Sequence, residues 1–241
     1  MLLFSPEEIV FMTSVIILGS VVQGLTGFGL ALVAAPLLAL IQTDFVPGPV
    51  IVANLLFTIL VTMSDRSGIH LAKLGWATGG RVSGTFLGAW VMIYLSKDGI
   101  ALFLGIAVLV IVVLNSLGLQ IAYTRRNLAI GGLLSGFSAT ITSIGGPFVA
   151  LVYQNQSATA IRGNMAGLFL VGSVFALISL YAVDKFNWHE LVISAYLIPG
   201  VIIGFAFSLL AKKWVAPRFL RPLIQTLCGV SGIMMLFKAL L

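Results

Sequence analysis

Two glycine-containing breaks interrupt long apolar stretches of this chain, one in each half. The first runs from Gln23 to Gly29, with Pro36 behind it, and the second runs from Ser135 to Pro147. Glycine permits unusual backbone conformations and proline removes a hydrogen-bond donor, so each break is expected to interrupt a helix. In a bilayer, an interrupted helix is tolerated only where its freed backbone faces protein or a polar cavity. Paired breaks in two halves of a chain are typical of transporter binding sites.

Composition places the chain in a membrane. Of its 241 residues, 60% are hydrophobic and 8% are charged, whereas a soluble domain carries roughly 25% charged residues. A soluble fold of this composition would expose large apolar patches and aggregate. The length allows about six to ten crossings of roughly 20 residues each. We therefore expect an all-α polytopic membrane protein.

The charged residues and the single cysteine exclude several classes of protein. The net charge is +6, but the basic residues are scattered among apolar spans and form no continuous basic face, so nucleic acid is not an expected partner. Cys228 is the only cysteine, so we expect no disulfide and no metal site. The sequence lacks a Walker-type phosphate-binding loop and an HExxH motif, so we expect neither an ATP-driven motor, nor an enzyme, nor a cofactor.

Polar residues divide the chain into ten apolar segments in two similar halves, residues 1–121 and 122–241. The segments are 9–22, 28–41, 46–63, 74–95 and 100–119 in the first half, and 128–141, 144–153, 163–183, 191–211 and 219–240 in the second. Matched pairs of residues support an internal duplication: Gly24 with Gly136, Pro36 with Pro147, Asn54 with Asn164, and the ladder Gly80, Gly84 and Gly88 with Gly200, Gly204 and Ser208. Such ladders favour close helix packing, here either between the halves or between the protomers of a homodimer.

The first two segments of each half are short. At 1.5 Å per residue they reach about 15–24 Å, less than the roughly 30 Å of the hydrocarbon core. We therefore expect each half to contain a broken or re-entrant helical hairpin followed by about three spanning helices. Short, tilted full spans are the alternative.

Charge placement predicts the topology. All of the main basic groups lie in the cytoplasm if each hairpin returns to the side from which it starts. These groups are Arg66 with Lys73, Arg125 with Arg126, Arg162, and the cluster in residues 212–221. The N-terminus, Asp44, Lys97 with Asp98, and the 184–190 loop then lie outside. The two halves would have opposite orientations, which makes them inverted repeats of the kind found in secondary transporters. We expect a multi-pass protein of the cell membrane with an external N-terminus.

The two breaks supply the main candidate ligands. Backbone N–H groups at the start of a half-helix attract anions, and the helix dipole adds to this attraction. A structural kink or tight packing is the alternative explanation for the glycines. The candidates at the first break are Gln23, Thr26, Gly27, Phe28 and Gly29, and those at the second are Ser143, Gly145, Gly146 and Pro147.

Four further polar residues lie in or beside apolar spans. Asn54 and Asn164 have two interpretations, an interhelical hydrogen bond or a donor to an oxyanion. Arg81 lies about eight residues into its segment; we favour an arginine that snorkels to the interface or forms a salt bridge, with attraction of a substrate as the alternative. Arg162 precedes the 163–183 segment, where it is a candidate for the mouth of the pathway.

These residues carry a family resemblance. The stretch from Gly24 to Leu38 resembles the first motif of the TauE/SafE family of sulfite-exporter-like permeases, the stretch from Gly136 to Val149 resembles its second motif, and Arg162-Gly163-Asn164 resembles the polar start of the next helix. The resemblance covers nearly the whole chain. It implies a small bacterial or archaeal permease of about eight spans, built as two related halves and linked to sulfite, sulfonates and related organosulfur anions.

The chain departs from that pattern in the residues expected to line the site. Residues 139–143 stand where the family often has more glycine, and Phe28 interrupts what is a run of three glycines in many relatives. The hypothesis is a secondary transporter for small anions such as sulfite or a sulfonate, with membrane lipids as its surroundings. An anion channel of the same fold, and an assembly or lipid-handling protein with purely structural glycines, remain alternatives.

Overall fold

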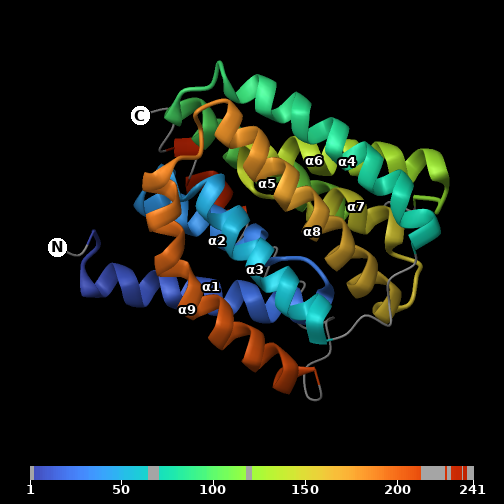
Figure 1. Ribbon diagram of the computed structural model, residues 1–241, viewed down its shortest axis with the longest axis horizontal. Coiled ribbons are helices and arrows are strands. Elements are labelled where there is room, and N and C mark those ends of the chain that lie inside the picture. The colour runs from blue at the N-terminus through green and yellow to red at the C-terminus, as the bar shows by residue number, and fades with distance from the viewer. Residues whose placement is uncertain are drawn as a thin grey trace.

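The described part of the chain is helical (Figure 1). The computed structural model describes residues 3–64, 71–117, 121–212, 226, 229–234 and 236–237. Its elements are α1 (Pro6–Thr26), α2 (Leu30–Ile41), the short 3-10 helix η1 (Thr43–Phe45), α3 (Gly48–Ser64), α4 (Leu71–Met92), α5 (Lys97–Ser116), α6 (Arg125–Thr142), α7 (Gly146–Tyr153), α8 (Ala158–Ala182) and α9 (Trp188–Ala211). Cys228, Arg66 and much of the expected last span, residues 219–240, lie outside the described residues.

Nine of the expected segments match these helices, but the first arm of each hairpin is longer than predicted. The helix α1 has 21 residues and α6 has 18, so the estimate that all four arms are short is wrong for these two. Polar residues extend them beyond the apolar run, since Ser5 and Glu8 form a capping box at the start of α1 and Gln23 lies within its last turns. The second arms, α2 with 12 residues and α7 with 8, are too short to cross a bilayer alone.

Each hairpin returns to the end of the molecule from which it starts. The ring of Phe4, which precedes α1, lies 5.3 Å from that of Phe45, which follows α2. The ring of Tyr123, which precedes α6, likewise lies 5.3 Å from that of Tyr153, at the end of α7. The two pairs of helices therefore form hairpins whose glycine-rich turns point away from the aromatic pairs.

Loops expected on one side of the membrane gather at one end of the molecule. Lys97, at the start of α5, forms a salt bridge with Asp44 in η1. The Lys185 ammonium donates a 2.9 Å hydrogen bond to the carbonyl oxygen of Leu95. We call this the Asp44 end. The opposite end, where Arg125 lies over the ring of Trp76, is called the Arg125 end.

The two halves of the chain pack into each other (Figure 1). Helix α1 packs on α9, α4 packs on α6, and α3 packs on α8. The glycine ladders lie in these contacts, because a Cβ atom on Gly84 would stand 2.0 Å from the carbonyl oxygen of Leu133 in α6, and one on Gly204 would stand 2.5 Å from the Cβ of Ser20 in α1. Both ladders therefore join one half to the other. An inverted duplication would produce these reciprocal pairings, and it remains a prediction, as do the homodimer and the division at residue 121.

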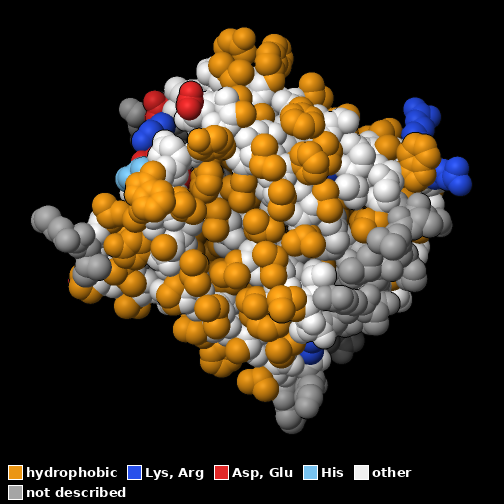
Figure 2. Space-filling model, viewed as in Figure 1, with side chains coloured by type: hydrophobic (Ala, Val, Ile, Leu, Met, Phe, Trp, Pro, Cys, Tyr) orange, Lys and Arg blue, Asp and Glu red, His pale blue; other side chains and the backbone are white. Residues whose placement is uncertain are grey.

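The outer surface is suited to lipid. Five stretches of the described chain are long and apolar enough to cross a membrane: Pro6–Thr26, Thr43–Ser64, Lys97–Leu114, Ala158–Ala182 and Trp188–Ala211. Large apolar side chains cover much of the face in Figure 2, and charged side chains lie at its margins. Exposed aromatic residues near the Asp44 end, namely Tyr94, Tyr181 and Trp188, are of the kind found at membrane–water interfaces. The protein is an all-helical, multi-pass membrane protein.

Candidate functional site

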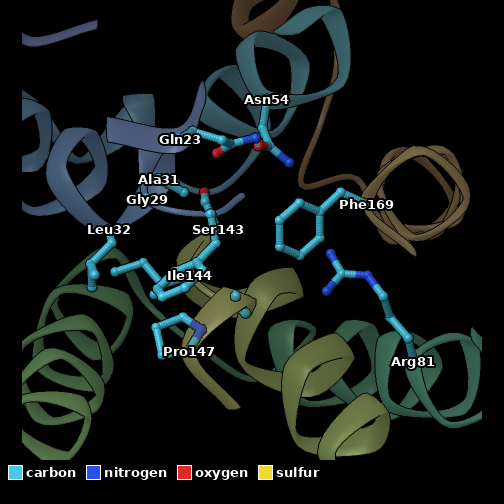
Figure 3. Close-up of a pocket in the computed structure, with 13 residues that line it drawn as sticks. Gln23, Gly29, Ala31, Leu32, Asn54, Arg81, Ser143, Ile144, Pro147 and Phe169 are labelled. Atoms are coloured by element: carbon cyan, nitrogen blue, oxygen red, sulfur yellow. Dashed lines mark hydrogen bonds between the residues drawn. The ribbon is translucent and has the colours of Figure 1, made fainter. Parts of the chain in front are cut away.

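The glycine-rich turns of the two hairpins meet inside the molecule. A Cβ atom added to Gly146, at the start of α7, would stand 2.7 Å from the Cβ of Phe28 in the first turn. A cavity lies beside this contact (Figure 3). It is lined by Gln23, Phe28, Gly29, Ala31, Leu32, Asn54, Arg81, Ser143, Ile144, Gly145, Gly146, Pro147 and Phe169. We call it the central cavity.

The central cavity is narrow. The space in which the centre of a water molecule fits is about 20 Å³, which is enough for one ordered water molecule. A sulfur oxyanion would therefore require the hairpins to move apart. The lining comes from both hairpins and from α3, α4 and α8, so such a movement would change the contacts between the two halves.

Two short helices begin at this cavity. Glycine occupies the N-cap position of both, Gly29 in α2 and Gly145 in α7, and neither helix start receives a side-chain hydrogen bond from that position. Only glycine suits the first position, since Gly29 has a φ of 133° and a Cβ there would stand 2.5 Å from Val22. Because helix N-termini carry positive potential, this pair of starts is suited to an anion.

Gln23 spans the first break. Its side-chain oxygen accepts a 3.0 Å hydrogen bond from the amide of Leu30, the first residue of α2. Its side-chain nitrogen donates a 2.8 Å hydrogen bond to the side-chain oxygen of Asn54, and the Asn54 amide donates in turn to Ser173, at 3.4 Å. The interhelical interpretation of Asn54 is thus realised in this conformation. Both side chains also line the cavity.

Ser143 ties the second break to the start of α3. Its hydroxyl donates a 2.8 Å hydrogen bond to the carbonyl oxygen of Pro47. Ser143 has a positive φ of 67°, a left-handed conformation that ends α6 and turns the chain toward α7. Its hydroxyl therefore serves the protein in this conformation and would have to leave Pro47 before it could donate to a ligand.

Arg81 does not snorkel, so that interpretation of it is wrong, and it forms no salt bridge with a described residue. Its side chain is only 3% exposed and points from α4 toward the centre of the cavity, beside the ring of Phe169 (Figure 3). The guanidinium carbon lies 5.1 Å from the centre of that ring, and one terminal nitrogen donates to the Ser135 hydroxyl. The sequence places Arg81 within reach of the interface, whereas the packing of α4 turns it inward.

Some predicted residues lie outside the central cavity. Thr26 bonds locally, with its hydroxyl donating to Val22 at 2.9 Å. Gly27 packs against Arg162, since a Cβ atom added to Gly27 would lie 3.2 Å from the Cα of Arg162. Both residues line a second, smaller cavity toward the Arg125 end. Asn164 is buried in α8 and is not among the residues that line either cavity.

Sequence reasoning missed three neighbours of Arg81. Phe169 and Gly172 lie one turn apart on the same face of α8, and Ser135 lies in α6. A Cβ atom on Gly172 would stand 1.7 Å from Nε of Arg81, so the absence of a side chain there makes room for the arginine. The spacing of Phe169 and Gly172 is visible in the sequence, but their pairing with α4 is not. In the described part of the chain, no group of three or more His, Cys, Asp or Glu side chains could hold a metal ion.

Two further cavities are connected to the central cavity through shared or hydrogen-bonded lining residues. The widest, at the Asp44 end, has about 350 Å³ of space for water centres and includes Asp44, Pro47 and Lys97 in its lining. The Ser143–Pro47 hydrogen bond joins a residue of its lining to a residue that lines the central cavity. The cavity beside Arg162 has about 10 Å³ and shares Gln23 with the central cavity. We call these the Asp44 cavity and the Arg162 cavity.

A comparison with protein families identifies the chain. The family model described as Sulfite exporter TauE/SafE matches residues 12–235. The chain belongs to the TauE/SafE family. This is a family of membrane transporters and not of enzymes, in agreement with the apolar helices and with the resemblance of the two glycine motifs. Searches of curated proteins and of solved structures returned no significant match.

Proposed function

We propose that this TauE/SafE protein transports small sulfur oxyanions, such as sulfite or sulfonates, which bind in the central cavity between the two hairpin turns. One observation carries the proposal. Breaks that lie far apart in the sequence meet at Phe28 and Gly146, and two helix starts with glycine N-caps and the buried Arg81 surround the cavity beside them. The family description, sulfite exporter, supports a sulfur oxyanion as the ligand.

The lining has the chemistry of a reversible anion site. Backbone N–H groups at the starts of α2 and α7 supply neutral donors, and helix dipoles favour negative charge there. Gln23, Asn54 and Ser143 have polar atoms at the cavity that are satisfied within the protein at present. An entering oxyanion would compete for these donors, so binding and the opening of the hairpins are coupled in this proposal.

Two hydrogen bonds divide the proposed pathway. The Ser143–Pro47 bond joins the linings of the central and Asp44 cavities, and Gln23, which bonds to Asn54, lines both the central and the Arg162 cavities. Each bond joins one hairpin to α3 or to the residue just before it. Alternate breaking of the two bonds would open the central cavity to one end at a time, which is the requirement for a transporter.

The narrowness of the pathway favours a transporter over a channel. A channel needs a continuous conducting path, whereas the central and Arg162 cavities have only about 20 and 10 Å³ for water centres. A purely structural role for the glycines does not explain why a buried arginine points into the cavity between them.

Flux measurements on the purified protein in liposomes test the proposed function. We expect saturable movement of sulfite or methanesulfonate that is absent from protein-free liposomes. Flux that stays proportional to concentration, with single-channel currents, would support the channel instead. If none of the sulfur oxyanions moves, the proposal is wrong. The external N-terminus remains part of the proposal.

A further inference from the structure

Arg81 is a buried positive charge that no described acidic side chain neutralises. It is the only Lys, Arg, Asp or Glu among the buried residues of the described chain. The salt bridge found in that part of the chain, between Lys97 and Asp44, lies at the Asp44 end. Among the described residues, the interior around the cavity therefore holds a cation without a counter-ion.

The bonds that Arg81 makes leave part of its guanidinium unsatisfied. One terminal nitrogen donates to Ser135, and the ring of Phe169 lies 5.1 Å from the guanidinium carbon. The Nε atom is buried and has no hydrogen-bond partner. Gly172 provides the space for this nitrogen, since a Cβ there would stand 1.7 Å from it. The surrounding helices thus accommodate the arginine without neutralising it.

The position of Arg81 is electrostatically unfavourable in the empty protein. A buried charge without a partner is strongly destabilising. The N-termini of α2 and α7 face the same cavity, and their positive potential opposes a second positive group there. Both unfavourable effects are relieved when an anion enters the cavity.

We propose that the transported anion is the counter-ion of Arg81 and carries a single negative charge. This proposal rests on the proposed function and specifies its substrate class. A helix dipole adds no net charge, so Arg81 sets the net charge of the empty site at plus one. A monoanion brings the site to zero, whereas a dianion leaves it at minus one, and the cost of burying a site is lowest when its net charge is zero. The expected ligands are bisulfite and organic sulfonates, in preference to the sulfite and sulfate dianions.

The wild-type protein in liposomes gives the primary test. Methanesulfonate is a monoanion and sulfate a dianion at neutral pH, and we expect methanesulfonate to be transported at least about tenfold faster. Sulfite flux should follow the concentration of bisulfite as the pH, equal on both sides, is varied. Transport of sulfate as fast as methanesulfonate, or sulfite flux that follows the dianion, would overturn the charge assignment and leave the proposed function intact. Absence of all flux would overturn both.

Variants of Arg81 test its part in the selection. Arg81→Gln removes the charge, and Arg126→Gln, at an exposed position at the start of α6, is the matched control. Without any anion, we expect Arg81→Gln to unfold at a higher temperature than the wild type, because an unpaired buried charge is lost. Methanesulfonate should stabilise the wild type, Arg126→Gln and, more weakly, Arg81→Lys, but not Arg81→Gln. Equal stabilisation of Arg81→Gln and the wild type would show that Arg81 is not the partner of the anion.

Discussion

The Ser143 hydroxyl donates a 2.8 Å hydrogen bond to the carbonyl oxygen of Pro47, a residue 96 positions earlier in the chain. Ser143 lines the central cavity and Pro47 lines the Asp44 cavity. A single side chain thus links the second hairpin to the start of α3 at the boundary between the narrow and the wide space.

Replacing Ser143 by alanine should make the central cavity more accessible from the Asp44 end. A hydrogen bond of this kind contributes roughly 0.5–1.5 kcal/mol, which corresponds to about a 2- to 10-fold change in the open population. The test uses a protein in which Cys228→Ser removes the native thiol and Ile144→Cys introduces one at the central cavity. The measurement is the rate at which a membrane-impermeant reagent modifies this introduced thiol, with and without Ser143→Ala. Ser83→Ala, which removes an exposed hydroxyl on α4, is the control. An unchanged rate would mean that the bond does not hold the cavity closed.

Alanine at Gly172 should displace Arg81. Its Cβ would stand 1.7 Å from Nε of the arginine, so the guanidinium must leave its place between Ser135 and Phe169. We expect initial transport rates in liposomes to fall by about tenfold or more, because a small displacement of a ligand-binding group has a large effect. Gly79→Ala is the matched control, since nothing lies within 4 Å of the added atom. Equal transport rates for the two variants would show that the position of Arg81 does not affect transport.

The contact between the hairpin turns can be tested by exchanging the small residue. Gly146→Ala would place a Cβ 2.7 Å from the Cβ of Phe28, and overpacking of this kind costs about 1–3 kcal/mol. We expect a lower unfolding temperature for Gly146→Ala, and partial recovery in the double variant with Phe28→Gly. The contrary outcome is additivity. If Phe28→Gly lowers the unfolding temperature of Gly146→Ala by as much as it lowers that of the wild type, the two turns are not in contact.

Gln23→Met should destabilise the first hairpin while conserving most of the side-chain volume. The variant removes the acceptor of the Leu30 amide and the donor to Asn54. Each buried polar group left without a partner costs about 1–3 kcal/mol. Thermal unfolding in detergent is the measurement. Thr62→Val removes a hydroxyl that bonds only within its own helix and should have a smaller effect, so a larger effect of Thr62→Val would contradict this account of Gln23.

Much of the helical architecture was predictable because apolar runs, and the polar residues that separate them, are local features of the sequence. The second arm of the first hairpin, for example, was expected at 28–41 and is observed at Leu30–Ile41. The first arm was underestimated because Gln23 and Thr26 continue a helix that the apolar run alone would have ended. The capping pattern of Ser5 and Glu8 is also visible in the sequence and marks the true start.

The candidate site was only partly predictable. The breaks around Gly29 and Gly146 were identified from composition and spacing, and both line the cavity. Arg81 was misinterpreted, because depth along a helix does not show which neighbour its side chain meets. Its inward orientation depends on Gly172 and Phe169, which lie on another helix about ninety residues later.

The sequence by itself determined that this chain belongs in a bilayer, where its helices break, and which polar residues its apolar segments contain. These properties follow from hydrophobicity and backbone preference, which act over short stretches of chain. The tertiary structure alone decided that the two breaks meet, that Ser143 and Gln23 bond to the region of α3, and that Arg81 faces the cavity without a described acidic partner. Those relationships depend on how helices distant in the sequence pack, and packing depends on the shapes of both partners at each contact.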